Sequence, residues 1–362
     1  MLVAVAEARP LRSLVEARLD LGDGIVSLVG PNGAGKTNLL EALYFSLTGR
    51  SFRTSDRREL IPFGEQLGRA EAVVRDVDGI EHRLLASVSR AEGRRHLLDG
   101  SPADAATIAR HRPPVAVFSP DRMALVKGAP GERRAHLDRY VAARWPSRGQ
   151  LRQRYGQALA QRNALLARFA GGPPSRDLDV WDGTLADAAA ALIAARADAV
   201  AELSTPFAAA AAELGLPGAA ELEYAPRAAG SAEELRAGLA ERRDADLRLG
   251  RTSWGPHLDE LKLATDGRSL RRYGSQGQQR IALLALLFAE REALRASGRP
   301  LPLLLLDDVM SELDSERRER LVERLGSDGQ AVVTAAAEES LPTAALERMV
   351  RISATTTRVL AA

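Results

Sequence analysis

The sequence has no cysteine and few aromatic residues. Phe, Trp and Tyr together make up 4% of the 362 residues. Disulfides and thiolate metal sites are therefore excluded, and the five histidines show no recognisable ligand spacing. Because few aromatic side chains are available for stacking on unpaired bases, we do not expect sequence-specific recognition of single strands.

Long hydrophobic runs are also missing. No stretch approaches the roughly 18 apolar residues of a membrane span, and the opening segment, MLVAVAEARPLRSL, has an acid and a proline where a signal peptide needs a longer apolar run. We therefore expect a cytoplasmic protein with no membrane partner. With 45% hydrophobic and 27% charged residues, the chain is long enough for two domains and a buried core.

Lysine is scarce, so the positive charge is almost entirely arginine. Only Lys36, Lys127 and Lys262 occur, and the net charge is +2. Residues 101–160, however, hold eleven Lys and Arg against four Asp and Glu. A local excess of this kind attracts polyanions, although a solvated arginine-rich helix face is an equally ordinary explanation.

The order of apolar runs and turn signals predicts an α/β fold with a helical middle. The expected strands are 24–29, antiparallel strands within 69–100 around Asp78-Gly79 and Asp99-Gly100, 115–118, 221–224, 260–264, 301–306 and 331–334. The expected helices are 36–47, 276–295 and a helical stretch over 132–215. Gly171–Pro174 should break that stretch into an antiparallel hairpin.

A glycine-rich phosphate loop follows the first buried strand. Residues 30–37, GPNGAGKT, fit the pattern GxxxxGK[ST] at the start of a helix. Inward N–H groups of such a loop meet the α- and β-phosphates of ATP, Lys36 reaches the β- and γ-phosphates, and Thr37 places its hydroxyl on Mg²⁺. The alternative is a glycine-rich turn that only caps a helix. The expected nucleotide contacts are Gly30, Pro31, Asn32, Gly33, Ala34, Gly35, Lys36, Thr37 and Asn38.

Two aspartates end the most apolar strand. Leu303–Leu306 is wholly apolar, as expected for a parallel strand covered on both faces, and Asp307 and Asp308 follow it. Because ligands lie beyond the carboxyl ends of such strands, we expect Asp307 to join Thr37 in binding Mg²⁺, with Asp307 acting through water. Asp308 would face the attacking water, so Lys36, Asp307 and Asp308 are the expected catalytic residues. The alternative is a strand that simply enters a capped turn.

A second anion site is predicted where a helix begins after Gly274. The segment 274–280, GSQGQQR, resembles the LSGGQ signature of ABC ATPases, with Gln276 in place of the first glycine. Ser275, Gly277 and Gln278 would contact nucleotide at this helix N-terminus. One molecule does not need two triphosphate sites, but two head-to-tail copies do, so we expect an ATP-dependent homodimer. The alternative is that Ser275 is an ordinary helix N-cap.

Three further positions extend the comparison with ABC ATPases. Ser311 and Asp314, in the segment SELD, either form the D-loop that joins two composite sites or begin a helix. Thr334 ends a strand where ABC transporters have a switch histidine, so it is the candidate for a γ-phosphate contact, or else only a strand end. Ser119 occupies the place of the Q-loop glutamine, and its role is left open.

Narrower segments make the chain similar, almost end to end, to the RecF family of bacterial recombination mediators, which is related to SMC-type ATPases. These segments are LLEAL at 39–43, LTGRSFRT at 47–54, VFSPD at 117–121, VKG at 126–128, ERR at 132–134, LDDV at 306–309 and SELD at 311–314. SMC proteins have long coiled coils between the two halves of the head, whereas this chain has only a short hairpin.

The resemblance implies an ABC-type P-loop ATPase head, with a mixed sheet, flanking helices and an antiparallel β subdomain, beside a second, mainly helical lobe. Residues 1–120 and 256–362 would form the ATPase lobe, and residues 121–255 the helical lobe. The resemblance also implies ATP and Mg²⁺ as cofactors and ATP-dependent dimerisation on DNA. Slow, DNA-stimulated hydrolysis would release the clamp, and RecR and RecO would cooperate in loading RecA at single-strand gaps in DNA repair.

One departure bears on rate. Asp308 stands where ABC transporters have a glutamate, and its side chain is one methylene shorter. The attacking water is then positioned less favourably, so we expect a switch rather than a motor.

DNA contacts are expected from arginine-rich surface, through nonspecific phosphate contacts that weaken as salt rises. The candidates are Arg53, Arg57, Arg58, Arg110, Arg112, Arg133 and Arg134.

Two other functions stay open. One is a nucleotide-binding subunit of an ABC transporter, against which the missing switch histidine and the inserted hairpin count. The other is a noncatalytic, ATP-gated DNA-binding structural protein.

Overall fold

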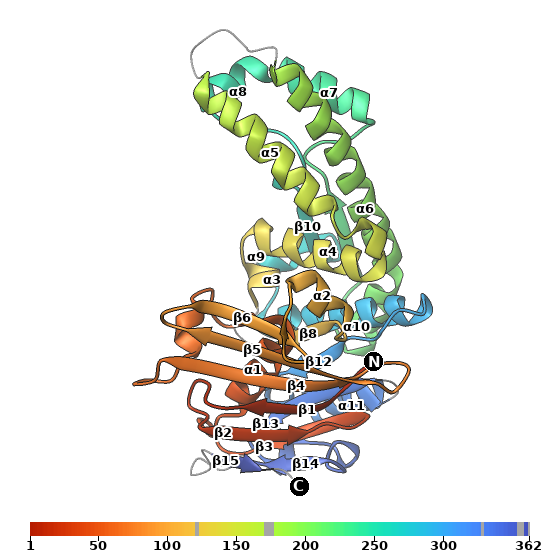
Figure 1. Ribbon diagram of the computed structural model, residues 1–362. Helices are drawn as coiled ribbons and strands as arrows, with labels where there is room; N and C mark the ends of the chain where they lie inside the picture. Colours follow the sequence, from red (N-terminus) through yellow and green to blue (C-terminus); the bar gives the residue numbers. More distant parts are fainter. Residues whose placement is uncertain (120–122, 170–176, 327–328, 353–357, 361–362) are drawn as a thin grey trace. The chain divides into compact units, whose positions relative to one another are not determined.

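The computed structural model describes residues 1–119, 123–169, 177–326, 329–352 and 358–360. The chain divides into two compact units, Met1–Met123 with Pro300–Ala362, and Ala124–Arg299 (Figure 1). The expected hairpin turn Gly171–Pro174 lies outside the described residues, as do Pro120 and Asp121 of the family-like segment VFSPD.

A five-stranded parallel sheet forms the centre of the first unit, in the order β14-β3-β13-β12-β8. Its strands are β3 (Gly24–Val29), β8 (Val115–Phe118), β12 (Leu303–Leu306), β13 (Gln330–Ala335) and β14 (Met349–Arg351). Every residue of β12 and β13 is buried, which explains why β12 is wholly apolar and why Ala331, Val332 and Val333 of β13 follow one another without alternation. The helices α1 (Lys36–Thr48) and α11 (Ser315–Gly326) follow β3 and β12 along the chain.

A seven-stranded sheet, antiparallel apart from the pairing of β15 with β2, completes the first unit in the order β15-β2-β1-β4-β5-β6-β7. Its strands are β1 (Leu2–Ala8), β2 (Glu16–Asp20), β4 (Leu67–Arg75), β5 (Glu81–Ser89), β6 (Gly93–Leu98), β7 (Ser101–Pro102) and β15 (Arg358–Leu360). The short helices η1 (Arg57–Leu60) and α2 (Ala105–Arg110) flank it. One apolar core joins both sheets and α1. The predicted combination of a mixed α/β head with antiparallel strands is confirmed.

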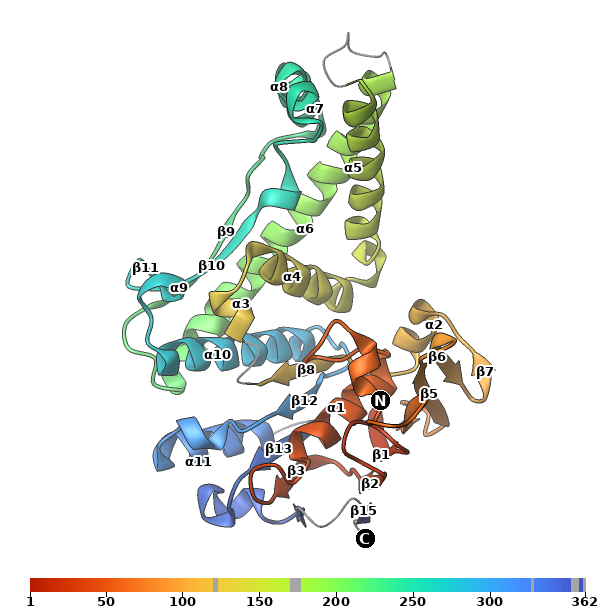
Figure 2. The ribbon, with the colours of Figure 1, turned by 90° about the vertical axis from the view of Figure 1, so that its left-hand side faces the viewer.

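The second unit is mainly helical. Its helices are α3 (Ala124–Lys127), α4 (Pro130–Arg144), α5 (Leu151–Arg168), α6 (Asp177–Glu213), α7 (Ala232–Glu241), α8 (Arg243–Leu249), α9 (Leu270–Tyr273) and α10 (Gln276–Ala296). A small antiparallel sheet contains β9 (Ala220–Ala225), β10 (Glu260–Thr265) and β11 (Arg268–Ser269). Figure 2 shows α5 lying along the much longer α6, as expected for an antiparallel pair of helices.

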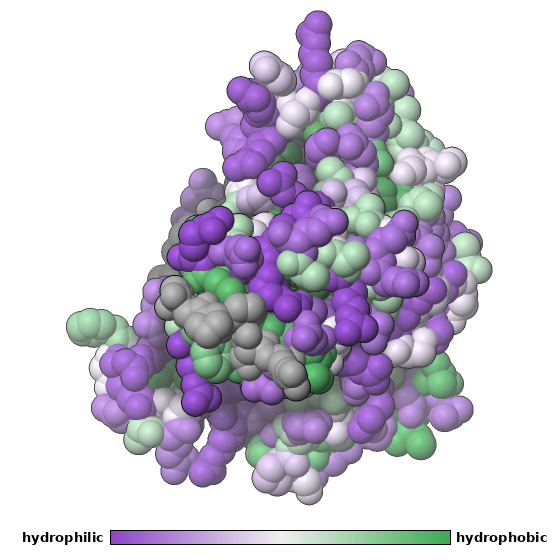
Figure 3. Space-filling view, turned by 90° about the horizontal axis from the view of Figure 1, so that it is seen from above, coloured by the Kyte–Doolittle hydropathy of each residue, from purple (hydrophilic) through white to green (hydrophobic). Residues whose placement is uncertain are grey.

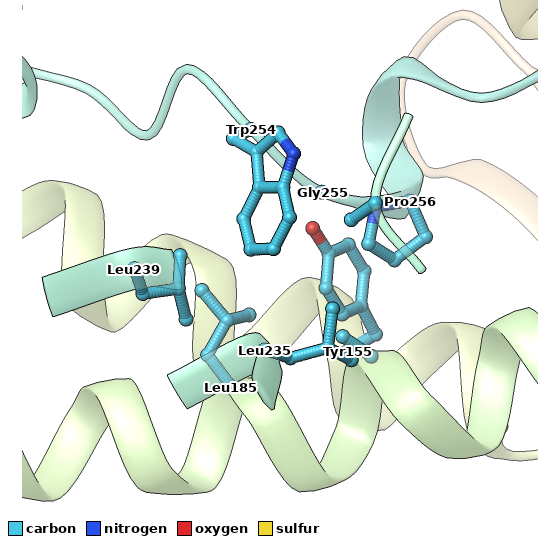
Figure 4. Close-up of a pocket in the computed structure, with 9 residues that line it drawn as sticks. Tyr155, Leu185, Leu235, Leu239, Trp254, Gly255 and Pro256 are labelled. Carbon is cyan, nitrogen blue, oxygen red and sulfur yellow. The ribbon is translucent and has the colours of Figure 1, made fainter. Parts of the chain in front are cut away.

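Apolar packing and buried ion pairs hold the second unit together. Between α5, α6 and α7, Tyr155, Leu235 and Trp254 line a hollow of about 10 Å³ (Figure 4), close to the least volume that one water needs, so it is a packing gap rather than a ligand site. Nearby, the fully buried Arg162 is 2.7 Å from both Asp182 and Asp246. Removing one partner of such a group leaves a buried charge uncompensated.

The second expected domain boundary is wrong. We expected the ATPase lobe to resume at residue 256, but the structure keeps residues 256–299 in the second unit. The reason is tertiary pairing: β10 pairs with β9 over six residues, and α10 packs extensively against α6. The first boundary falls after residue 123 rather than 120.

The surface offers no large apolar face in the view of Figure 3, where hydrophilic side chains predominate and hydrophobic ones form small separate patches. None of the helices within the described ranges is long and apolar enough to traverse a bilayer.

Candidate nucleotide site

The phosphate loop joins the carboxyl end of β3 to the N-terminus of α1. Gly33 and Gly35 have φ values of +84° and +96°, a left-handed conformation that favours glycine, and α1 begins after Gly35 with no side-chain cap. Gly30 has no room for a side chain, because a Cβ there would lie 1.9 Å from the carbonyl oxygen of Ile352. These features leave the first N–H groups of α1 free to face an anion.

Lys36 lies over this loop and close to both acids. Its Nζ donates to the carbonyl oxygens of Gly30 at 2.6 Å and Pro31 at 3.0 Å. Burial lowers the pKa of Lys36, while the neighbouring carboxylates of Asp308 and Asp307 act in the opposite direction. The structure therefore brings together the three residues that the sequence predicted to be catalytic.

Thr37 and Asp307 are in direct contact across 270 residues of sequence. The Thr37 hydroxyl lies 3.0 Å from Oδ1 and 2.9 Å from Oδ2 of Asp307. A hydroxyl that gives its proton to a carboxylate keeps oxygen lone pairs for a metal. Burial raises the pKa of Asp307, and hydrogen bonds from Thr334 and Thr37 act against that rise. Thr37 and Asp307 therefore fit Mg²⁺, which takes one or two protein oxygens and completes its shell with water and phosphate.

Asp308 has an unusual backbone conformation. Its φ of +50° is in the left-handed region, which is strained by about 1–3 kcal/mol for such residues and persists only where the surroundings hold it. Its backbone N–H donates to Oγ1 of Thr334 at 2.8 Å. The half-buried Asp308 thus leaves the strand at an angle that the neighbouring strand helps to fix.

Thr334 is not where the predicted γ-phosphate contact would need it. The residue is fully buried, and its hydroxyl donates to Oδ1 of Asp307 at 2.8 Å while accepting from the N–H of Asp308. With no exposed surface, Thr334 cannot reach a phosphate directly. Ser119, which occupies the place of the Q-loop glutamine, is buried directly after β8.

The signature-like segment lies in the second unit, at the start of α10. Ser275 is exposed and forms a capping box: its Oγ accepts from the N–H of Gln278 at 3.2 Å, and Oε1 of Gln278 accepts from the N–H of Ser275 at 2.8 Å. The ordinary N-cap geometry is therefore present. It does not use the hydroxyl proton of Ser275, so a donor remains available beside the exposed Gly277.

The predicted D-loop residues are bonded to Asp308, which follows β12, and to α11. Ser311 is exposed, and its hydroxyl donates to the carbonyl of Asp308 at 2.9 Å. Asp314 accepts from the N–H of Arg317 at 2.9 Å, which is the helix-start geometry that the alternative interpretation required.

The arginine candidates separate into engaged and available residues. Arg133 is buried and holds Glu260 through two bonds of 2.6 and 2.8 Å, so its prediction as a DNA contact is wrong. Arg134 donates to the carbonyl of Asp259 at 2.7 Å, and Arg53 lies 3.0 Å from Oδ1 of Asn38. The remaining candidates Arg57, Arg58 and Arg110 are exposed, and Arg112 is half-buried.

Four arginines of the first unit form a group that we name the arginine cluster: Arg50, Arg57, Arg94 and Arg112. Burial and the neighbouring positive charges of Arg57 and Arg50 lower the pKa of Arg94, and burial together with Arg50 lowers that of Arg112. In the part of the chain that the structure describes, none of the four forms an ion pair with a carboxylate. Sequence reasoning missed Arg50 and Arg94, because the packing of α1 beside β6 brings together residues that are distant in the chain.

The chain was compared with known proteins. The family model described as the RecF/RecN/SMC N-terminal domain matches residues 5–360. DNA replication and repair protein RecF of Streptomyces avermitilis is 40% identical over 353 residues, covering 91% of this chain and 92% of that protein. RecF of Anaeromyxobacter sp. is 41% identical over 337 residues, covering 89% of each. A solved structure, described as the recombination mediator protein RecF-ATP in the RecFOR pathway, matches with a TM-score of 0.84 at 28% identity, covering 94% of this chain and 93% of that one.

Proposed function

Because this chain belongs to the RecF family of DNA replication and repair proteins, we propose that it is an ATP-dependent recombination mediator that dimerises on binding ATP, hydrolyses it slowly and acts at gapped DNA. The observation that carries this proposal is the contact between Thr37 of the phosphate loop and Asp307 at the end of β12, at 2.9 and 3.0 Å. That contact joins oxygen ligands for Mg²⁺ to a ring of backbone donors for phosphate.

The residues of this site have separate tasks in the proposed reaction. The first N–H groups of α1 and the Lys36 amine bind the phosphates, and Thr37 and Asp307 hold Mg²⁺, which neutralises phosphate charge when bound. Asp308 orients the attacking water. Since its side chain is shorter than the usual glutamate, water is held less firmly, and slow turnover follows.

A second copy completes the site in this proposal. Ser275 of one copy would donate its hydroxyl proton to the γ-phosphate bound by Lys36 of the other, beside the N-terminus of α10. Ser311 and Asp314 would lie at the junction of the two composite sites, because Ser311 is bonded to the carbonyl of Asp308.

The test is the size of the protein by light scattering, with and without ATP and Mg²⁺. Wild type should change from monomer to dimer, and Ser275→Arg should stay monomeric while binding ATP as wild type does. Ser231→Arg is the matched control, because Ser231 is also exposed and caps a helix of the second unit with a capping box. Wild type that stays monomeric with ATP, or Ser275→Arg that dimerises normally, would refute the two-copy site.

The arginine cluster is the surface that we propose for DNA. Four like charges without carboxylate partners repel one another, and a phosphate backbone would relieve that repulsion while releasing counterions. Such contacts carry no sequence information, in keeping with binding at gapped duplex DNA. The pathway named for the solved RecF relative suggests RecO and RecR as partners, with RecA loading as the outcome that family resemblance implies.

A further inference from the structure

A threonine outside the phosphate loop connects the two carboxylates of the candidate nucleotide site. Thr334 lies on β13, next to β12, and the parallel register pairs Leu306 with Val333. Asp307 and Thr334 are therefore the next neighbours across the two strands. Both bonds of the Thr334 hydroxyl are 2.8 Å, one to Oδ1 of Asp307 and one from the N–H of Asp308.

The left-handed backbone at Asp308 needs an explanation of its own. Among the residues that the structure describes, four other than glycine have positive φ: Arg12, Asp99, Asp266 and Asp308. Asp99 and Asp266 each precede a glycine in a tight β-hairpin turn, where this conformation is usual. Asp308 follows a parallel strand and precedes Val309, so no hairpin accounts for it. Two contacts hold it: its N–H donates to Thr334 on the neighbouring strand, and its carbonyl accepts from Ser311, three residues further along the chain.

We propose that Thr334 is a positioning residue for hydrolysis. Its hydroxyl orients the Asp307 carboxylate toward the metal. The same hydroxyl fixes the backbone turn from which the Asp308 side chain faces the attacking water. A hydroxyl has one proton and two lone pairs, so it can donate to the first aspartate and accept from the second at the same time. Thr37 also donates to Asp307, but it belongs to the phosphate loop. Among the hydrogen bonds of the described residues, those of the Thr334 side chain are the ones that join both acids to β13. This inference rests on the proposed ATPase function.

The test compares Thr334→Val, which keeps the shape and removes the hydroxyl, with Thr334→Ser, which keeps the hydroxyl. We expect Thr334→Val to hydrolyse ATP about 10- to 100-fold more slowly, the usual effect of losing a group that orients a metal ligand, and Thr334→Ser to stay within about threefold of wild type. The second readout does not depend on activity. It is the dissociation constant of the nucleotide measured in EDTA divided by the dissociation constant measured in Mg²⁺. Thr334→Val should lower that ratio about tenfold and leave the EDTA value unchanged.

Ser27→Ala is the control for loss of a buried hydroxyl in the same sheet. Ser27 is fully buried on β3, opposite Val333, and its hydroxyl donates to the carbonyl of Ala345 at 2.6 Å. This variant should lower thermal stability without changing the rate or the Mg²⁺ ratio. If Thr334→Val does not fold, Thr334→Ala replaces it and is compared with Thr334→Ser.

The outcomes separate the two claims. A wild type that neither hydrolyses ATP nor dimerises would overturn the proposed function. An active wild type with Thr334→Val equal to it in rate and Mg²⁺ ratio would overturn only the role of Thr334. A loss in Thr334→Val that Thr334→Ser fails to restore would also overturn that role, since the hydroxyl would not be the cause.

Discussion

The two segments that the proposed two-copy site would combine are built differently. Around the acids, Thr37, Asp307, Thr334 and Asp308 form one chain of hydrogen bonds between the phosphate loop and two parallel strands. Around the signature-like segment, Ser275 is exposed, and in the contacts that the described residues make its side chain bonds only to Gln278 of its own helix. The first is therefore assembled within one unit, whereas the second presents a donor that its own unit leaves unused.

This difference predicts which properties a single copy should have without a second copy. An acid pair held by hydrogen bonds from two sides is preorganised, so in the proposed function metal and nucleotide binding would need no second copy. The exposed N-terminus of α10 can bind an anion only when another molecule brings that anion to it. Variants of Asp308 should therefore impair hydrolysis and spare assembly, whereas variants of Ser275 should spare ATP binding by one copy and impair assembly.

The largest expected effect is on hydrolysis, in Asp308→Asn. The amide keeps the size of the side chain but cannot take a proton from water, so the rate should fall by about 10²- to 10⁴-fold. ATP-dependent dimerisation should persist and last longer, because in the proposed function hydrolysis would separate the two copies. Single-turnover hydrolysis and light scattering on the same samples measure both properties. If the variant loses dimerisation along with hydrolysis, the acids and Ser275 do not have separate roles in hydrolysis and assembly.

A smaller effect is expected on DNA affinity, from the arginine cluster. Replacing Arg50 and Arg94 by alanine removes two unpaired charges, and each lost phosphate contact should reduce the slope of log affinity against log salt by about 0.9. At 0.1 M salt the affinity for gapped duplex should fall on the order of tens of fold. Fluorescence anisotropy over a range of salt concentrations measures both quantities.

The same strands supply the matched control for that experiment. Arg83 on β5 and Arg95 on β6 are also exposed, but they are paired with Glu71 and Glu92 at 2.8 and 3.0 Å. Their double alanine variant should keep the wild-type slope, because ion-paired arginines release few counterions. Equal losses in the two double variants would mean that total charge, rather than the cluster, decides DNA binding. An unchanged slope in both would remove this surface from DNA binding.

The parts of the site that consist of contiguous residues could be predicted from the sequence. The loop GPNGAGKT and the run LLLLDD each carry their own strand and turn signals, so their place at the carboxyl edge of a parallel sheet followed from periodicity alone. The antiparallel strands were predicted for the same reason, from Asp-Gly turns between alternating residues.

Contacts between distant segments could not be predicted in this way. The two-way bonding of Thr334 depends on the register of β12 and β13, and nothing in a threonine at a strand end indicates it. Arg133 was expected at the surface because it lies in a basic stretch, but its partner Glu260 is 127 residues away. The misplaced boundary at residue 256 has the same origin, since β9 and β10 pair across the helices between them.

The smallest expected effect separates the capping role of Ser275 from its proposed role in the dimer. Ser275→Ala and Ser231→Ala each remove an N-cap hydroxyl from a capping box, and each should lower the free energy of unfolding by about 1 kcal/mol. Denaturant unfolding without nucleotide measures this loss, which should be similar for both. Only Ser275→Ala should also raise the protein concentration needed for half-maximal dimerisation with ATP, because only that hydroxyl would face the γ-phosphate of a second copy. If the two variants dimerise equally well, Ser275 caps a helix and does nothing more.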